Sequence, residues 1–288
     1  MNHGVPQSIV YLASTALRIA ATLLLAALLG LALVRLSPGY GVDERELDTR
    51  LSAESIAQLR AAKTESFPEM VRRYAARTAN GDWGVSQSIG MPVRQLIEER
   101  WRLTLSSMAI GLLTAWALAV AWTAAGILYP WTRFTGQAFS FGLLAVPAGL
   151  VAFFCFLTGA PVSIAIAAMV FPQVFQYTRN LAYEESVKPH ILAARARGEG
   201  RWTLLLRHIA PAVWTRWIAV LGVSAAGAAG AAIPAESICD SPGLGQLAWK
   251  AALGRDVDLL APLILLIACC TVFANTAADL LRKTGEPA

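Results

Sequence analysis

The chain has 288 residues, of which 56% are hydrophobic and only 15% charged, and its mean hydropathy is +0.52. A soluble domain of this length could not bury so much apolar surface, so the composition argues against a soluble globular protein and indicates an integral membrane protein. The formal net charge of +5 does not require a nucleic-acid partner, because basic residues that flank membrane spans account for it.

Five long stretches contain no Asp, Glu, Lys or Arg: residues 19–34, 103–132, 134–178, 217–235 and 259–278. A bilayer core needs about 20 apolar residues per helical span, so four of these stretches predict one helix each. The stretch 134–178 is too long for one helix, and its Thr-Gly-Ala-Pro sequence at 158–161 predicts a turn between two helices. We therefore expect an all-α membrane protein with six transmembrane helices. The first of them is expected to be an uncleaved anchor rather than a signal peptide.

The distribution of Lys and Arg predicts the orientation of these spans. The loops on the side of both termini hold ten basic residues, whereas the short loops on the other side hold only Lys250 and Arg255. The positive-inside rule therefore places both termini in the cytoplasm. The segment 37–102 is too long for this rule and is balanced in charge, so we expect a translocated helical segment with helices at 52–63 and 67–79.

The predicted span 217–235 consists almost entirely of small residues. Gly222, Ala226 and Gly230 recur every four positions, which removes bulk from one stripe and allows another backbone to approach. This composition is compatible with an ordinary helix of a crowded bundle and with a helix that lines a pathway, and it does not decide between the two.

The sequence carries no motif that predicts catalysis or metal binding. It has no phosphate-binding Gly-rich loop, no HExxH and no Ser-His-Asp arrangement, and its four cysteines and three histidines lack metal or disulfide spacing. No predicted span contains a buried carboxylate or histidine for a proton relay, since Asn275 and Asp279 fall in the last turns of the sixth helix. We expect no catalytic residue, no metal and no cofactor bound by this chain.

The segment between the fourth and fifth spans is unusual because it carries seven basic residues between positions 179 and 216. We expect a helix over 181–197, which Pro189 must either begin or break, and a turn at Gly198. A second short helix is expected over 201–209, with apolar residues along one side. Such a segment favours docking to another protein, and a basic helix pair held by lipid head groups is the alternative.

The apolar side of that second helix would consist of Trp202, Leu205 and Leu206. At this segment the sequence resembles the permease subunits of ATP-binding-cassette (ABC) importers, whose cytoplasmic motif reads Glu-Ala-Ala, three residues, Gly and, further on, Ile-x-Leu-Pro. The motif falls on Ala193, Ala194, Gly198 and Pro211, whereas Leu192, His208 and Ala210 replace its Glu, Ile and Leu. The ARARG sequence at 194–198 and the Arg207-His208 pair are similar to the dipeptide, oligopeptide and nickel branch of these permeases.

Further similarities to that branch cover nearly the whole chain. They lie at Leu33 to Gly39, Gly81 to Ser86, Thr178-Arg179, Glu236 with Pro242 to Gly245, Arg255-Asp256, Asn275 and Asp279. The chain departs from the branch in its short loop at 158–161, in Pro189-His190 where an Asp-Tyr pair is usual, and in Ala212 in place of an asparagine.

The resemblance implies an ABC importer type I transmembrane domain. The tail and first helix would occupy 1–36, an extracytoplasmic helical segment 37–99, the remaining five helices 100–283 with a coupling loop at 179–212, and a cytoplasmic tail 284–288. The implied partners are a second permease, two ABC ATPase subunits that bind ATP and Mg²⁺, and an extracytoplasmic substrate-binding protein. The complex would lie in a bacterial inner membrane and import small peptides or a related small solute.

The resemblance also implies roles for individual residues. The ATPase-coupling loop would use Ala193, Ala194, Arg195, Arg197, Gly198, Arg201, Leu205, Arg207, His208 and Pro211. Pathway or helix-packing positions would be Gly222, Ala226 and Gly230. Outer turns or contacts to the binding protein would involve Glu236, Pro242, Gly243, Gly245, Arg255 and Asp256. An ion-coupled secondary carrier and a non-transporting membrane scaffold are the rival functions, although neither inverted repeats nor midplane ionisable groups support a carrier.

Overall fold

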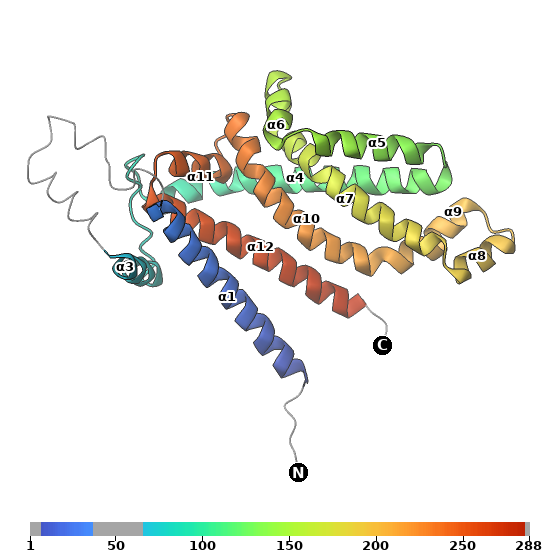
Figure 1. Ribbon diagram of the computed structural model, residues 1–288, viewed down its shortest axis with the longest axis horizontal. Helices are drawn as coiled ribbons and strands as arrows, with labels where there is room; N and C mark the ends of the chain where they lie inside the picture. Colours follow the sequence, from blue (N-terminus) through green and yellow to red (C-terminus); the bar gives the residue numbers. More distant parts are fainter. Residues whose placement is uncertain (1–6, 37–65, 286–288) are drawn as a thin grey trace, which may run out of the picture. The chain divides into compact units, whose positions relative to one another are not determined.

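The computed structural model describes residues 7–36 and 66–285, and most of these residues lie in helices (Figure 1). The helices are α1 (Gln7–Leu36), α3 (Phe67–Ala79), α4 (Val93–Leu128), α5 (Thr132–Ala145), α6 (Ala148–Leu157), α7 (Val162–Ser186), α8 (Pro189–Ala196), α9 (Arg201–Thr203), the π-helical turn η2 (Leu204–Ile209), α10 (Ala210–Ile238), α11 (Leu244–Leu253) and α12 (Val257–Gly285). Within these residues the only β pairing is an isolated bridge between Val85 and Pro92. The all-α prediction is confirmed for this part of the chain.

Several helices have the length and composition of membrane spans. Three helical stretches of the described chain qualify by themselves, at 93–128, 201–238 and 257–279, and the bent pair α5 and α6 qualifies as a unit. Large apolar side chains such as Leu113, Phe134 and Phe273 are exposed on these helices. Outward-facing apolar side chains are what a lipid environment requires, so the structure supports a multi-pass membrane protein.

The stretch from 134 to 157 differs from the single helix that the sequence predicted. Helix α5 ends at Ala145, and α6 begins at Ala148 after a bend of 98°. Val146 is extended because it precedes Pro147, and a residue before proline is disfavoured in the helical region. The predicted turn at 158–161 is confirmed, with Gly159 at φ +66° and Pro161 immediately before α7.

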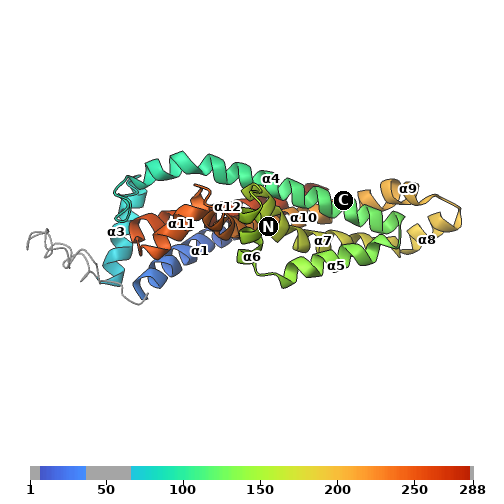
Figure 2. The ribbon, with the colours of Figure 1, turned by 90° about the horizontal axis from the view of Figure 1, so that it is seen from above.

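The chain divides into two compact units, one formed by residues 1–99 and 250–269 and the other by residues 100–249 and 270–288. In the second unit α7 packs mainly against α10 and also along α5 (Figure 2). Alanines of α10 at positions 228, 232 and 235 are buried at this contact, and their small size lets α7 approach closely. Phe171 and Phe175 of α7 stack at 5.5 Å, and Trp122 stacks on Phe139 at 5.3 Å.

The small-residue positions of α10 do not share one packing face. Gly222 is buried, and a Cβ there would lie 2.7 Å from the Cβ of Ala278 in α12. Gly230 is exposed with nothing within 4 Å, and Ala226 is half-buried. Residues four apart rotate by about 40° per step around a helix of 3.6 residues per turn, so these three positions drift away from one stripe.

In the first unit, α3 has the bounds that the sequence predicted, and its Phe67, Val71 and Tyr74 pack against Ala261 of α12. The other predicted helix, at 52–63, lies outside the described residues.

Asp256 lies buried in the same unit, where its carboxylate accepts hydrogen bonds from Ser86 Oγ at 2.6 Å and from Ser88 N at 2.9 Å. The other oxygen of Asp256 caps α12 through Leu259 N. The resemblance offered Asp256 as an outer turn residue or a contact for a binding protein, and in the structure its buried carboxylate joins residues 86–88 to the start of α12. Arg255 next to it is exposed, with φ +51°.

Candidate functional site

The most distinctive local structure is the α8–α9 hairpin, residues 187–211, which joins α7 to α10. In Figures 1 and 2, α8 and α9 lie beyond the adjoining ends of α7 and α10. Helix α7 stops at Ser186, Lys188 is extended, and α8 begins with Pro189 in its first turn. Proline suits that position because the amide it lacks would have no partner there. Pro189 therefore breaks the helix expected over 181–197 into two.

Gly198 forms the turn that the sequence predicted. Its φ is +85°, its amide donates to the carbonyl of Arg195 at 3.0 Å, and the amide of Glu199 donates to Ala194 O at 3.3 Å. These two bonds are the Schellman arrangement that ends many helices with a left-handed residue. A Cβ at position 198 would have nothing within 4 Å, so backbone conformation rather than space requires the glycine.

The hairpin is packed onto the unit that carries it. Ile191 and Ala194 of α8 are fully buried and cluster with Leu204 and Ile209 of η2 and with Ala182 of α7. A small residue at 194 lets α8 lie close to η2. This cluster fixes α8 to the adjoining ends of α7 and α10.

The second arm of the hairpin differs from the separate short helix that was expected over 201–209. Residues 201–238 form one continuous helix, widened into a π turn just before Pro211. In a regular α-helix the ring of Pro211 would clash with the carbonyl of Arg207, and a wider turn relieves that crowding. π turns are frequent at functional sites.

The apolar side of this arm is split between the interior and the surface. Leu205, which the resemblance assigned to the coupling loop, is only 7% exposed and packs inside the chain. Trp202 and Leu206 are 58% and 64% exposed and are the apolar side chains that the arm presents outward. Leu205 therefore contributes to the interior of the hairpin, and Trp202 and Leu206 form the apolar part of its outer face.

Polar contacts hold the two arms together. His208 Nε2 lies 2.7 Å from the Glu199 carboxylate, and Arg197 donates to the other Glu199 oxygen at 3.0 Å. Both hydrogen bonds lower the pKa of Glu199 below its usual value, and the bond from His208 has the larger effect. Arg201, which the resemblance assigned to the coupling loop, donates to the carbonyl of Leu128 at 2.6 Å and so caps the end of α4.

Glu185 is a buried acid at this site that the sequence reasoning missed. Its carboxylate lies 2.7 Å from Lys188 Nζ, 2.8 Å from Arg216 Nη2 and 3.5 Å from His190 Nε2. The pair with Arg216 joins the last turn of α7 to the first turns of α10, across the base of the hairpin. The sequence feature that could have drawn attention to it is the pair Glu184-Glu185, since these are the only acidic residues between positions 100 and 198.

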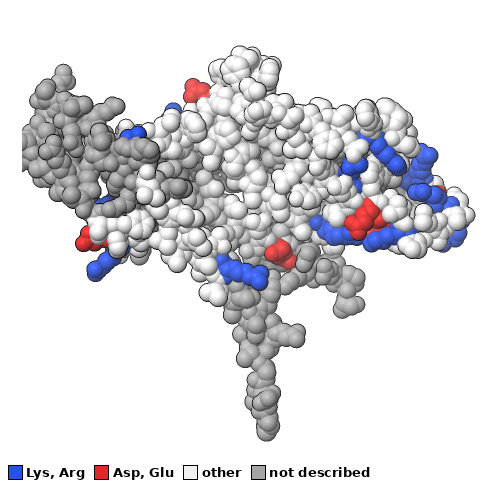
Figure 3. Space-filling model, viewed as in Figure 1, with Lys and Arg blue, Asp and Glu red and all other residues white. Residues whose placement is uncertain are grey.

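The surface of the hairpin is basic. Arg195, Arg197 and Arg207 are exposed, and Figure 3 shows Lys and Arg side chains gathered over the end of the second unit that carries α8 and α9. Ala193 is exposed beside Arg195, and Pro211 is exposed at the start of α10. The hairpin therefore combines a buried apolar base with an outer face of basic and large apolar side chains.

The Pro-Gly-Leu-Gly sequence at 242–245 surrounds a second buried carboxylate. Glu236, in the last turn of α10, accepts a hydrogen bond from Gly245 N at 2.7 Å at the start of α11. A side chain at Gly243 would overlap this carboxylate, and a Cβ at Gly245 would lie 2.7 Å from the carbonyl of Ala232. Glu236, Gly243 and Gly245 thus form a structural joint between α10 and α11, while Pro242 is exposed. Glu185 and Glu236 lie just beyond the uncharged stretches, where a buried carboxylate was not expected.

Comparison with known proteins identifies the family. Residues 117–287, more than half of the chain, match the family of binding-protein-dependent transport system inner membrane components. The chain belongs to this family. The predicted resemblance to importer permeases is confirmed, and the inner membrane location agrees with the apolar helices.

Relatives of this permease extend the match beyond that region. The probable peptide ABC transporter permease y4tP of Sinorhizobium fredii is 24% identical over 308 residues, covering 94% of this chain and 96% of that protein. The glutathione transport system permease GsiC of Salmonella paratyphi A is 25% identical over 291 residues, covering 93% and 94%. The dipeptide transport system permease DppB of Alkalihalophilus pseudofirmus is 26% identical over 124 residues, covering 43% and 37%.

We expect Gly245→Ala to lower the stability of the permease by about 1–3 kcal/mol, because the new methyl group would overpack the joint against the Ala232 carbonyl and Glu236. Gly142→Ala is the matched control, since α5 leaves open space at that position and alanine favours a helix. Thermal unfolding of the purified permease, followed by tryptophan fluorescence, measures both variants. Equal stability of the two would contradict this account of the joint.

Proposed function

We propose that this permease forms, with a second permease of similar fold, the translocation pathway of an ABC importer for small peptides or a related small solute. The names of the relatives, which include peptide, glutathione and dipeptide permeases, support this substrate class. Two ATPase subunits would bind ATP and Mg²⁺, and an extracytoplasmic binding protein would deliver the solute. This chain would contribute the pathway and no catalytic residue.

The observation that carries the proposal is the contrast between the base and the outer face of the α8–α9 hairpin. Its base is fixed to α7 and α10 by the buried Ile191 cluster and by the Glu185–Arg216 pair. Its outer face leaves Trp202 and Leu206 exposed next to basic side chains. Large apolar residues on a rigid, charged projection are typical of a protein contact, with the apolar pair at its centre and arginines at its rim.

The same geometry supports a coupling mechanism. When the ATPase pair closes on ATP, a hairpin docked to one ATPase would be displaced with it. Because the hairpin is packed on the ends of α7 and α10, the displacement would move these helices as rigid bodies. The pathway would thereby shift between inward-facing and outward-facing states, since docking favours one of two discrete arrangements.

The proposal includes an arrangement in the membrane. Six spans would be formed by α1, α4, the α5–α6 pair, α7, α10 and α12, with both termini and the α8–α9 hairpin in the cytoplasm. The excess of Lys and Arg on that side supports the orientation. The segment 37–99 would lie on the extracytoplasmic side, where the binding protein docks.

A photoreactive amino acid at position 206 tests the proposed contact in the assembled transporter. We expect cross-links from this position to an ATPase subunit. Phe273 is the control position, because it is also apolar and exposed but lies on α12, away from the hairpin. Cross-links to lipid alone from position 206, or equal ATPase capture from position 273, would reject the hairpin as the docking element.

A further inference from the structure

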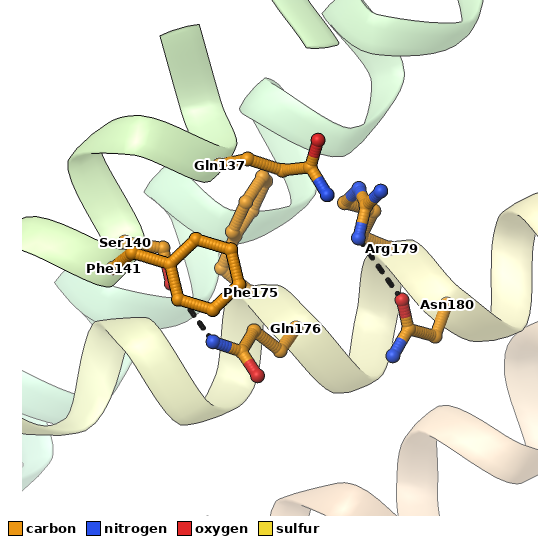
Figure 4. A pocket seen from close by; sticks show the side chains of 7 residues that line it. All are labelled: Gln137, Ser140, Phe141, Phe175, Gln176, Arg179 and Asn180. Atoms are coloured by element: carbon orange, nitrogen blue, oxygen red, sulfur yellow. Dashed lines mark hydrogen bonds between the residues drawn. The ribbon is translucent and has the colours of Figure 1, made fainter. Parts of the chain in front are cut away.

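A cavity of about 120 Å³ lies between α5 and α7, and two phenylalanines, Phe141 and Phe175, line it together with polar side chains (Figure 4). Gln137, Ser140 and Phe141 line it from α5, and Gln176, Arg179 and Asn180 line it from α7. Its volume exceeds the roughly 30 Å³ that a water molecule occupies in the liquid. Polar groups that line a cavity between two apolar helices are costly unless something satisfies their hydrogen-bonding capacity.

The cavity contains an uncompensated positive charge. Arg179 Nη1 donates to the Asn180 amide oxygen at 3.1 Å, and the Gln137 amide accepts from Nη2 at 2.7 Å only when its oxygen, rather than the nitrogen drawn in Figure 4, faces the guanidinium. The Nε of Arg179 is buried without a hydrogen-bond partner. Among residues 7–36 and 66–285, no carboxylate forms an ion pair with Arg179. The hydrogen-bond partners of Arg179 are therefore all neutral, and one of its donors is unused.

A second guanidinium lies nearby and increases this positive charge. Arg133 and Arg179 lie 5.1 and 4.9 Å from the centroid of the same Tyr183 ring. Arg133 donates to the carbonyl of Gly126 and, within the described residues, likewise forms no ion pair with a carboxylate. Two cations that share one aromatic ring without an acidic partner form a local positive potential, which attracts an oxyanion.

The position of the cavity indicates where that oxyanion comes from. Arg179 is the first charged residue after the uncharged stretch 134–178, so it belongs at a membrane interface rather than at the bilayer centre. Phe141 and Tyr177 are exposed on the same two helices and provide apolar surface for an acyl chain. We propose that the Arg179 cavity binds the phosphate group of an anionic phospholipid, with Arg179 contacting the phosphate and Phe141 the adjoining chain.

The test uses the whole transporter, reconstituted in phosphatidylcholine vesicles with or without phosphatidylglycerol, and native mass spectrometry of the retained lipid. We expect the wild type to retain phosphatidylglycerol and Arg179→Gln to retain it at least about tenfold less well, because the variant loses a charge-assisted contact. Arg94→Gln is the control, since it removes the same charge from an exposed residue of another helix. Arg179→Lys keeps the positive charge but lacks the planar guanidinium. Its retention of phosphatidylglycerol should therefore lie between those of the wild type and Arg179→Gln.

Gln137→Glu separates an anion site from a merely structural arginine. The new carboxylate would supply the missing counter-charge at the observed 2.7 Å contact, so we expect phosphatidylglycerol retention to fall while thermal stability is kept or raised. Unchanged lipid retention in both Arg179→Gln and Gln137→Glu would overturn the proposal. It would also be overturned if a photoreactive peptide labelled position 180 and a photoreactive phospholipid did not. The cavity would then hold a carboxylate of the transported solute.

Discussion

Replacing Gly198 by proline is expected to abolish ATP-dependent uptake while leaving membrane insertion intact. Proline fixes φ near −65°, whereas Gly198 requires φ +85°, and proline also lacks the amide that donates to Arg195. The turn that directs the second arm of the hairpin back to α10 would therefore be lost. Uptake of labelled di- and tripeptides by the reconstituted transporter, together with the amount of permease in the membrane fraction, measures the two effects.

Gly200→Pro is the matched control for this substitution. Gly200 lies two residues further along the same turn, but its φ of −66° is already the value that proline adopts. We expect near-normal uptake from Gly200→Pro. Uptake by Gly198→Ala should lie between that of Gly198→Pro and that of Gly200→Pro, because an alanine in the left-handed backbone conformation costs about 1–2 kcal/mol. Normal uptake by Gly198→Pro would show that this turn does not transmit motion.

The features that the sequence predicted well are those decided by local chemistry. The turns at 158–161 and at Gly198 follow from glycine and proline, and the bounds of α3 follow from a short amphipathic pattern after a polar segment. Pro147 carried the same kind of local signal for the bend between α5 and α6. Uncharged length cannot reveal this bend, because a straight span and a bent pair of helices are equally free of charge.

The features that could not be predicted depend on contacts between distant residues. Leu205 and Leu206 are neighbours of the same residue type, and only the packing of the folded chain decides that the first is buried and the second exposed. Glu185 meets Arg216 across 31 positions, so no local pattern reveals that a glutamate beside a basic loop becomes buried. The same holds for Glu236, whose partner Gly245 belongs to another helix.

Removing the buried acid at the base of the hairpin should have the largest effect on stability. Glu185→Ala leaves Lys188 and Arg216 without their shared partner, and such a loss costs about 3–5 kcal/mol for a fully buried pair. Lys188 and Arg216 are 40% and 34% exposed and can recover part of their hydration. We therefore expect the free energy of unfolding of the assembled transporter, measured by thermal unfolding, to fall by about 2–3 kcal/mol. ATP hydrolysis should continue with reduced uptake, because the hairpin is no longer fixed to α10.

Glu184→Ala provides the control, since its carboxylate is 63% exposed and lies 3.6 Å from the same arginine. An exposed pair of this kind contributes at most about 1 kcal/mol, so this variant should retain both stability and uptake. A double-mutant cycle of Glu185→Gln and Arg216→Gln isolates the pair itself, and we expect the two changes to be far from additive. If the effects simply add, or if Glu184→Ala is as damaging as Glu185→Ala, then the pair does not join α7 to α10. The hairpin would then be held to the spans by its apolar cluster alone.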